Sequence, residues 1–506
     1  MYTDKETMIK DIESIMHDKR LTYWQRSDQL AKYAAGILDY PKDTPQEFYR
    51  LKDNGEICDL SEGPGPYSAR YIIPDYEKFL KEGSEFLRLK PATNLMEATN
   101  NLLIFYHNCH GLDRFVVFIG RLDVLLEPFV KEMEYEEAKS ILRYFLINID
   151  RTLSDSFIQA NLGPYETITG NIILELLAEL QNITPNVSLR YDPDITSDAF
   201  ATKAIETSLK CANPAFAYDK FYRENVGENY AIASCYNGLL IGGGAFTLTR
   251  LRLGTIASHS ESVDDFFNNK LALAIDTQLK FMDAKIKNLM EERVFFDTDF
   301  VVTEGFVSKD KFVGLFGIVG LCECVNNLMK LSNLDYTFGP DEYANEMGVK
   351  VLDFINEKVK QHKNKYCYKE HFVMHAQVGT GLDTSDSPGT RIKVGQEIDL
   401  YPHLKQCGLY HKYFPSGVGD IFPFDETALR NPSAILDIFK GGFKVGCKYL
   451  STYLADGDLV RVTGYLIKKS EVEKYRQGKM VANDSVCLVP GQQDNNHIFD
   501  RKVESL

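Results

Sequence analysis

The sequence predicts an α/β fold, because short apolar segments alternate with amphipathic stretches over most of its 506 residues. The segments that predict strands are 115–118, 187–191, 239–241 and 295–302. The stretches that predict helices include 172–180 and 270–290. Residues 1–100 have the pattern of helices joined by polar connections. We therefore expect an N-terminal helical region followed by an α/β core that begins near residue 101.

The C-terminal region, 431–506, carries clear start and stop signals. Asn431 and Pro432 are an N-cap and a first-turn proline, and they open a helix that we expect to extend to about residue 453. An Ala-Asp-Gly-Asp turn follows. This pattern puts residues 461–465 in a loop between two helices. Loops on rigid flanking elements often carry functional residues.

The composition argues against several classes of protein. The formal net charge is −15, whereas a nucleic-acid-binding surface is expected to be basic. The longest strongly apolar stretch, 313–321, is too short to span a bilayer. The first sixteen residues lack the apolar core of a signal peptide. Ten cysteines without C-x-x-C pairs or disulfide spacing predict reduced thiols, a cytoplasmic location and no metal site.

Residues 461–465, Arg-Val-Thr-Gly-Tyr, form the most specific motif of the chain. Taken alone, the motif indicates only a turn with a glycine at positive φ. Near the C-terminus, however, it resembles the glycyl radical loop. In that family the central glycine loses an α-hydrogen to a radical S-adenosylmethionine activating enzyme, because an α-carbon without a side chain can become planar between two amides. The resemblance implies a stored radical on Gly464 and an activating enzyme as partner.

Residues 230–235, Tyr-Ala-Ile-Ala-Ser-Cys, resemble the Tyr-Ala-Ile-Ala-Cys-Cys stretch of pyruvate formate-lyases. In this family a cysteine on a loop inside the barrel exchanges hydrogen with the glycyl position, so the resemblance implies that Cys235 forms the working thiyl. Cys211 is the nearest rival, although a buried cysteine is commonly just a small apolar residue. Three further segments resemble family elements in the expected order, namely 120–123, 184–190 and 317–321.

The resemblance spans roughly residues 100 to 480 and extends to the YjjI-type group, whose members end with the same Arg-Val-Thr-Gly-Tyr loop. It implies a ten-stranded glycyl radical enzyme barrel of two five-stranded half-sheets surrounded by helices. Residues 101–430 would form the barrel core with its cysteine finger loop, and 431–506 the glycyl radical region. The resemblance also implies oxygen sensitivity, no bound cofactor, a small polar organic substrate and a homodimer.

Two departures from other family members bear on the reaction. Ser234 stands where pyruvate formate-lyases have the first of two cysteines, and a hydroxyl is a poor nucleophile without a base. Asn237 stands where diol dehydratases and choline-cleaving lyases place a glutamate base, and an amide cannot take up that proton. A formate C-acetyltransferase-like acyl transferase is the alternative enzyme. A non-catalytic binding or repair protein on the same fold is the alternative from another class.

Several polar residues are candidate substrate contacts. Asn186, Ser188 and Arg190 alternate with apolar residues, so a strand would turn all three to one face. If that face lines the barrel, Arg190 would hold a carboxylate or phosphate, with a structural ion pair as the equal alternative. Glu166 and Asn237 complete the predicted contacts.

Three further features have both a structural and a functional interpretation. His375 is a candidate general base. Glu323 lies in an apolar run, where a carboxylate is costly unless paired, so it is either catalytic or part of a buried network. The glycines at 242–244 lack the Lys-Ser/Thr ending of a phosphate-binding loop. We therefore expect close packing beside the cysteine rather than phosphate binding.

Overall fold

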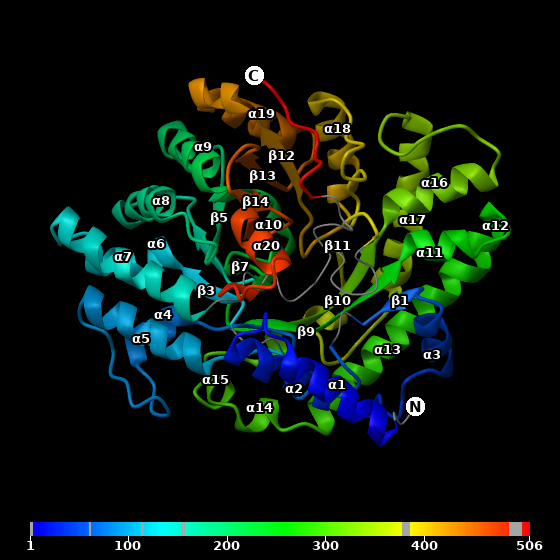
Figure 1. The fold of residues 1–506 in the computed structure, drawn as a ribbon, viewed down its shortest axis with the longest axis horizontal. Helices are drawn as coiled ribbons and strands as arrows, with labels where there is room; N and C mark the ends of the chain where they lie inside the picture. The colour runs from blue at the N-terminus through cyan, green and yellow to red at the C-terminus, as the bar shows by residue number, and fades with distance from the viewer. Residues whose placement is uncertain are drawn as a thin grey trace.

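The protein forms two half-sheets surrounded by helices, as Figure 1 shows. The computed structural model describes residues 4–59, 62–112, 116–153, 155, 157–376, 385–484 and 498–506. Within these residues the predicted α/β class is confirmed. One half-sheet has the five strands that were predicted, and the other has six.

The six-stranded sheet has the order β12-β13-β6-β5-β4-β3. Its strands are β3 (Phe118–Arg121), β4 (Gln159–Leu162), β5 (Asn186–Tyr191), β6 (Ala215–Tyr218), β12 (Asp420–Phe424) and β13 (Tyr449–Leu454). Strands β3 to β6 are parallel, β13 is antiparallel to β6, and β12 is parallel to β13. All six residues of β5 are buried, which is typical of a parallel strand covered on both faces.

The five-stranded sheet is built on the long strand β9. Its strands are β1 (Ile57–Cys58), β2 (Tyr71–Ile73), β9 (Gly243–Arg252), β10 (Phe312–Val319) and β11 (Val373–Ala376). Strands β9, β10 and β11 are parallel, and both β1 and β2 pair antiparallel with β9. The N-terminal region therefore contributes two strands to this half of the barrel.

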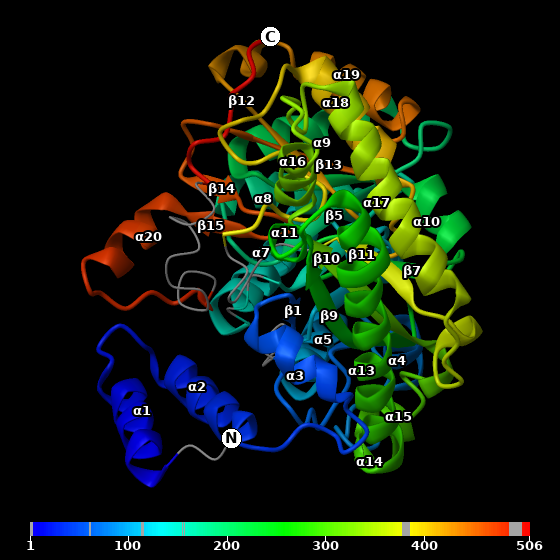
Figure 2. The ribbon, with the colours of Figure 1, turned by 90° about the vertical axis from the view of Figure 1, so that its right-hand side faces the viewer.

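Two hairpins are separate from the large sheets. The cysteine hairpin consists of β7 (Tyr230–Ala233), residues 234–236 and β8 (Asn237–Leu240). The glycine hairpin consists of β14 (Leu459–Arg461), residues 462–465 and β15 (Leu466–Lys468). In the view of Figure 1 both hairpins fall between the two half-sheets, and Figure 2 shows the glycine hairpin on the side of the molecule that carries α20.

The helices cover the outside of both sheets, so their apolar faces and the strands form one continuous core. The helices before and within the first sheet are α1 (Lys5–His17), α2 (Tyr23–Gly36), α3 (Gln46–Asp53), α4 (Tyr76–Glu82), α5 (Leu95–Asn108), α6 (Leu122–Val130), α7 (Tyr135–Thr152), α8 (Ile168–Leu180), α9 (Asp198–Cys211) and α10 (Asp219–Asn225). Those that follow are α11 (Leu253–Ser258), α12 (Val263–Asp265), α13 (Ala272–Glu291), α14 (Phe295–Thr298), α15 (Phe300–Thr303), α16 (Leu321–Leu331), α17 (Glu342–Gln361), α18 (Leu400–His411), α19 (Pro432–Lys444) and α20 (Lys469–Arg476).

Most of the predicted elements are confirmed. The predicted strands 187–191 and 239–241 correspond to β5 and β8, and the predicted helices 172–180 and 270–290 correspond to α8 and α13. The segment 115–118 meets β3 at residue 118, while residue 115 lies outside the described residues.

Three expectations were wrong. Residues 295–302 form the short helices α14 and α15 instead of a strand, because Asp299 caps the second one by accepting a bond from Val301 N. Helix α19 ends at Lys444 instead of near residue 453, and residues 449–454 are strand β13. Residues 461–465 lie at the turn of the glycine hairpin, between two strands instead of two helices.

Helices α1 and α2 stand on the same side of the molecule as α20, as Figure 2 shows. A hydrogen bond of 2.8 Å from Gln25 Nε2 to Asp484 Oδ1 joins the N-terminal helices to the segment after α20. Among the described residues, none of the helices is both long and apolar enough to cross a membrane.

Candidate active site

Cys235 lies at the tip of the cysteine hairpin, in a strained backbone. Ser234 and Cys235 have φ values of 43° and 88°, which residues other than glycine rarely adopt. The buried Asn237 side chain stabilises this turn, because its Nδ2 donates to the carbonyls of Ala233 (2.8 Å) and Ser234 (2.5 Å). The hairpin thus holds the thiol in one fixed place.

Contacts from β4 and from the loop before β12 fix the cysteine hairpin. The Asn161 side chain on β4 makes two bonds to the backbone of Ile232, one of 2.9 Å to its carbonyl and one of 2.8 Å from its N–H. On the other strand, Gly238 N donates to Ser416 O at 2.5 Å. Because these groups are buried, breaking any of the bonds would leave unsatisfied polar atoms in the core.

Gly464, at the turn of the glycine hairpin, packs directly on Cys235. A methyl group built on Gly464 would lie 1.8 Å from Cys235 Cα and 2.3 Å from Cys235 Cβ. Both residues are buried. No side chain fits at position 464 in this arrangement, and the two α-carbons lie side by side. The structure therefore brings together the two residues that the motifs singled out.

The Cys235 thiol is kept protonated by its surroundings. Burial raises its pKa to about 11, although the Gly464 N–H directed at the sulfur and the nearby Arg391 and Arg461 oppose the shift. At neutral pH the side chain is accordingly S–H and not thiolate. A neutral thiol can donate a hydrogen atom, whereas nucleophilic attack requires the thiolate.

Buried polar and aromatic side chains surround the two hairpins. Ser188 Oγ lies 3.0 Å from Tyr449 OH and accepts a 2.5 Å bond from Gln159 Nε2. The ring of Tyr236, the residue after Cys235, lies 5.7 Å from the rings of both Tyr449 and His375. His375 is fully buried. These groups provide a polar lining next to the thiol.

The three predicted substrate contacts on β5 have different surroundings in the structure. Ser188 faces Tyr449 and belongs to the lining described above. Asn186 is buried at the start of the strand. Arg190 forms a 2.9 Å ion pair with Asp219 and lies 4.1 Å from the ring centre of Tyr230. The structure therefore shows the ion-pair alternative for Arg190.

The other two predicted contacts lie in different places. Glu166 is exposed, and its carboxylate accepts bonds from Asn171 (3.0 Å) and Ser197 (2.8 Å) at two helix starts. Glu166 therefore joins α8 to α9 at the surface instead of facing the core. Asn237 lies beside Cys235, and its Oδ1 has no hydrogen-bond partner in the part of the chain that the structure describes.

The remaining candidates have structural partners. Cys211 Sγ lies 3.2 Å from the carbonyls of Thr207 and Asn213, while Gly464 contacts Cys235 instead. Glu323 is half-buried and accepts bonds from the backbone and side chain of Ser387. The triple glycine is closely packed as predicted, but its nearest neighbours are Tyr71 and Lys311 and not the cysteine hairpin: a methyl on Gly244 would lie 2.0 Å from Tyr71 O.

Two arginines hold the glycine hairpin, Arg461 within the Arg-Val-Thr-Gly-Tyr motif and Arg501 outside any motif, and the partners of both were not predicted. Arg461 Nε and Nη2 donate to Ala212 O at 3.1 and 2.6 Å. Arg501, from the C-terminal segment, donates to Arg461 O (2.5 Å) and Val462 O (2.9 Å). Their acceptors are backbone carbonyls distant in sequence, and a residue pattern does not specify such partners.

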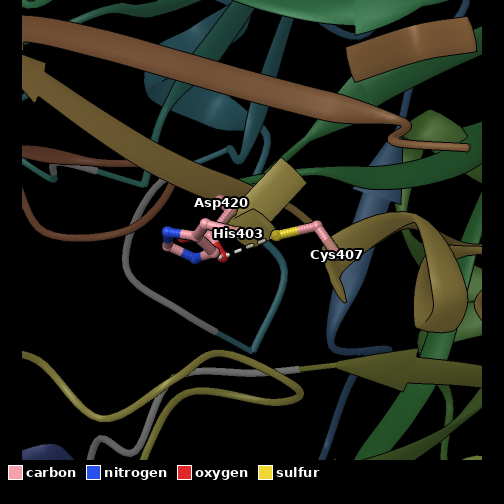
Figure 3. A group of neighbouring side chains, drawn as sticks. All are labelled: His403, Cys407 and Asp420. Carbon is pink, nitrogen blue, oxygen red and sulfur yellow. Dashed lines mark hydrogen bonds and ion pairs between the residues drawn. The ribbon is translucent and has the colours of Figure 1, made fainter. Parts of the chain in front are cut away.

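One group of described residues could hold a metal ion, namely His403, Cys407 and Asp420 (Figure 3). His403 Nε2 and Cys407 Sγ each lie 3.1 Å from Asp420 Oδ2. Burial alone would raise the pKa of Asp420, but His403, Arg391 and Cys407 together hold it below its usual range. Because Arg391 Nε lies 3.7 Å from the same carboxylate, a cation already offsets its charge. The absence of a bound metal stays a prediction.

Comparison with known proteins agrees with this geometry. The family described as glycyl radical enzyme YjjI-like matches residues 21–504. The chain belongs to this family. It is similar to an uncharacterized protein of Haemophilus influenzae, with 42% identity over 98% of this chain and 97% of the relative. The uncharacterized protein YjjI of Escherichia coli is 38% identical over 89% of this chain and 88% of the relative.

Solved structures of the same fold include an anaerobic ribonucleotide reductase from Thermotoga maritima with glycerol in the active site. Its TM-score is 0.72, with 13% identity and 94% of each chain covered. Identity at this level shows the fold alone, and that fold is the barrel of glycyl radical enzymes. The family and the fold together indicate an enzyme that works by radical chemistry.

Proposed function

We propose that the protein stores a radical on Gly464 and transmits it through Cys235 to a small polar organic substrate. The observation that carries this proposal is the contact between the two residues, in which a methyl on Gly464 would lie 1.8 Å from Cys235 Cα. Hydrogen transfer needs reacting atoms held at near-attack distance, and two buried hairpins in contact satisfy that need.

The proposed cycle has balanced steps. A radical S-adenosylmethionine enzyme first removes one α-hydrogen atom from Gly464. The glycyl radical then takes the hydrogen atom of the Cys235 S–H bond, which leaves a thiyl. The thiyl takes a hydrogen atom from a substrate C–H bond, and the substrate radical rearranges or fragments. The product radical recovers hydrogen from Cys235, and the new thiyl recovers hydrogen from Gly464.

The thiol chemistry favours this cycle over the alternatives. A formate C-acetyltransferase-like enzyme needs a nucleophilic cysteine, but burial raises the pKa of Cys235 to about 11, and Ser234 replaces the second thiol. A non-catalytic protein would have no need for the Gly464–Cys235 contact. The buried site also keeps water from reactive intermediates. The activating enzyme, the cytoplasmic location, the absence of a bound cofactor and a homodimer belong to the same proposal.

The test is anaerobic activation followed by electron paramagnetic resonance. We expect a doublet from the single remaining α-hydrogen in the wild-type protein and no signal in Gly464→Ala. Activated enzyme exposed to air should be cleaved at Gly464. The absence of a signal, with an activating enzyme that works on its own partner, would overturn the proposal. An intact chain after exposure of radical-bearing protein would also contradict it.

A further inference from the structure

Arg391 is a buried cation with an unused hydrogen-bonding edge. Its side chain is only 7% exposed. Nε donates to Gly419 O at 2.7 Å and lies 3.7 Å from Asp420 Oδ1. Nη1 is buried and has no acceptor among the residues that the structure describes. Buried donors are normally satisfied, so an unused one in the core points to an acceptor supplied from outside the chain.

The backbone that anchors Arg391 packs on the residue next to Cys235. A methyl on Gly419 would lie 3.2 Å from the ring of Tyr236, and one on Gly417 would lie 1.8 Å from Tyr236 O. The backbone that anchors the guanidinium group is therefore in contact with the cysteine hairpin. Its charge acts on the Cys235 thiol and lowers the thiol pKa against the larger effect of burial.

A second buried guanidinium faces the same region. Arg461 is fully buried, and its Nε and Nη2 donate hydrogen bonds to Ala212 O. Its Nη1 has no acceptor within the described part of the chain. The Asp420 carboxylate already accepts bonds from His403 and Cys407. Positive charge thus exceeds negative charge next to the thiol, which suits a substrate that brings its own anion.

We infer that the substrate is an organic anion whose carboxylate or phosphate oxygen accepts a hydrogen bond from Arg391 Nη1. This inference rests on the proposed function for the role of Cys235 and adds the class of molecule on which it acts. Gly419 O and Asp420 fix the guanidinium from one side, so its free edge sets where the anionic group lies. A C–H bond next to that group then faces the thiol.

Binding to the full-length protein without activation tests the inference. The probes are lactate, pyruvate, malonate and succinate, each paired with its uncharged amide, together with inorganic phosphate. The readout is the shift in melting temperature over a concentration series at constant ionic strength. We expect at least one carboxylate, or phosphate, to give a saturable rise that its uncharged counterpart does not give. A rise with a carboxylate indicates a carboxylate substrate, and a rise with phosphate alone indicates a phosphorylated one.

Two conservative variants locate the binding site. Arg391→Lys should weaken the binding of the responding anion by about tenfold or more, because lysine cannot reproduce the guanidinium edge. Arg190→Lys is the matched control, since that buried arginine is paired with Asp219, and it should change affinity by less than about threefold. Undiminished binding in Arg391→Lys would overturn the inference, as would equal responses to anions and amides.

A measurement on wild-type crystals covers the case in which the variants do not fold. Crystals soaked in sodium iodide should show an anomalous peak in contact with Arg391 Nη1, and a map without such a peak would count against the inference. None of these experiments requires a radical. Failure to form the glycyl radical would therefore leave the anion result standing, and a radical-bearing protein that binds no anion would refute only the inference.

Discussion

The cysteine hairpin and the glycine hairpin meet at one point but are held in different ways. The cysteine hairpin is fixed at its backbone by buried amides, with Asn161 on one strand and Asn237 inside the turn. The glycine hairpin is a separate two-stranded sheet held by arginine side chains: Arg501 donates to its carbonyls, and its own Arg461 donates to Ala212 O. The first arrangement suits a group that must stay in place, and the second suits one that must move out and return.

The C-terminal segment explains how the glycine hairpin is kept in place. Residues 498–506 run beside β12, where Glu504 N donates to Pro423 O and Asp425 N donates to Glu504 O (Figure 1). Arg501 extends from this segment to the glycine hairpin. Detaching these nine residues would therefore release the two charge-assisted bonds of Arg501 and the pairing of Glu504 with β12, while β12 stays paired with β13. An activating enzyme needs access of this kind to reach the Gly464 α-carbon.

The largest effect is expected from Gly464→Ala, which removes the contact between the hairpins. The new methyl would collide with the Cys235 backbone, so the glycine hairpin must shift, at a cost of about 1–3 kcal/mol or more. We expect no radical signal after activation and a lower melting temperature. A variant that keeps wild-type stability would show that the two hairpins do not pack as described.

Cys235→Ser should separate radical storage from turnover. The serine O–H bond is too strong to give its hydrogen atom to a glycyl radical, so turnover should fall by at least about a thousandfold. The glycyl doublet in the spectrum should be retained, because the serine fits the same site. Spin quantitation and product assay on one sample measure both quantities. Retained turnover would assign the thiyl to another cysteine, with Cys211 as the first to test.

How far the sequence predicts this fold depends on the kind of signal. The spacing of apolar residues predicts helix α8, which is buried along one side, and strand β5, which is buried on both faces. The prediction of a strand at 295–302 was wrong, because a short apolar run has the same pattern in a buried helix as in a strand. The end of α19 was missed because Gly446, with φ of 111°, stops the helix, while the earlier Gly442 packs inside it.

The residues of the site also differ in whether the sequence could predict them. Gly464 and Cys235 were predictable because each lies in a local motif, and the structure brings them into contact. Arg391 and Arg501 were not predictable, because their partners are carbonyls at Gly419 and Val462, and any residue supplies a carbonyl. For Arg190 the sequence left a substrate contact and an ion pair as equal alternatives, since alternation along a strand predicts the face of a side chain and not its partner.

Loosening the cysteine hairpin should lower both stability and turnover. Asn237→Ala leaves the carbonyls of Ala233 and Ser234 without their donor, at a cost of about 1–3 kcal/mol. Asn108→Ala is the control, because that exposed amide makes one similar bond, to Ile104 O, and its loss should cost less than about 0.5 kcal/mol. Thermal unfolding of both variants measures the difference. Equal losses would show that Asn237 does not stabilise the turn.

Loosening the glycine hairpin should have the smallest of these effects and should speed activation. Arg501→Gln replaces the charged donor to Arg461 O and Val462 O by a neutral amide, and a charged hydrogen bond is worth roughly 1 kcal/mol more than a neutral one. Since about 1.4 kcal/mol corresponds to a factor of ten in an opening equilibrium, the glycyl radical should form about tenfold faster. Lys502→Gln, which alters only the partly exposed pair with Asp399, should change the rate little. Slower activation of Arg501→Gln would show that the C-terminal segment helps the activating enzyme to bind instead of restraining the hairpin. The two hairpins would then not differ in how easily they move.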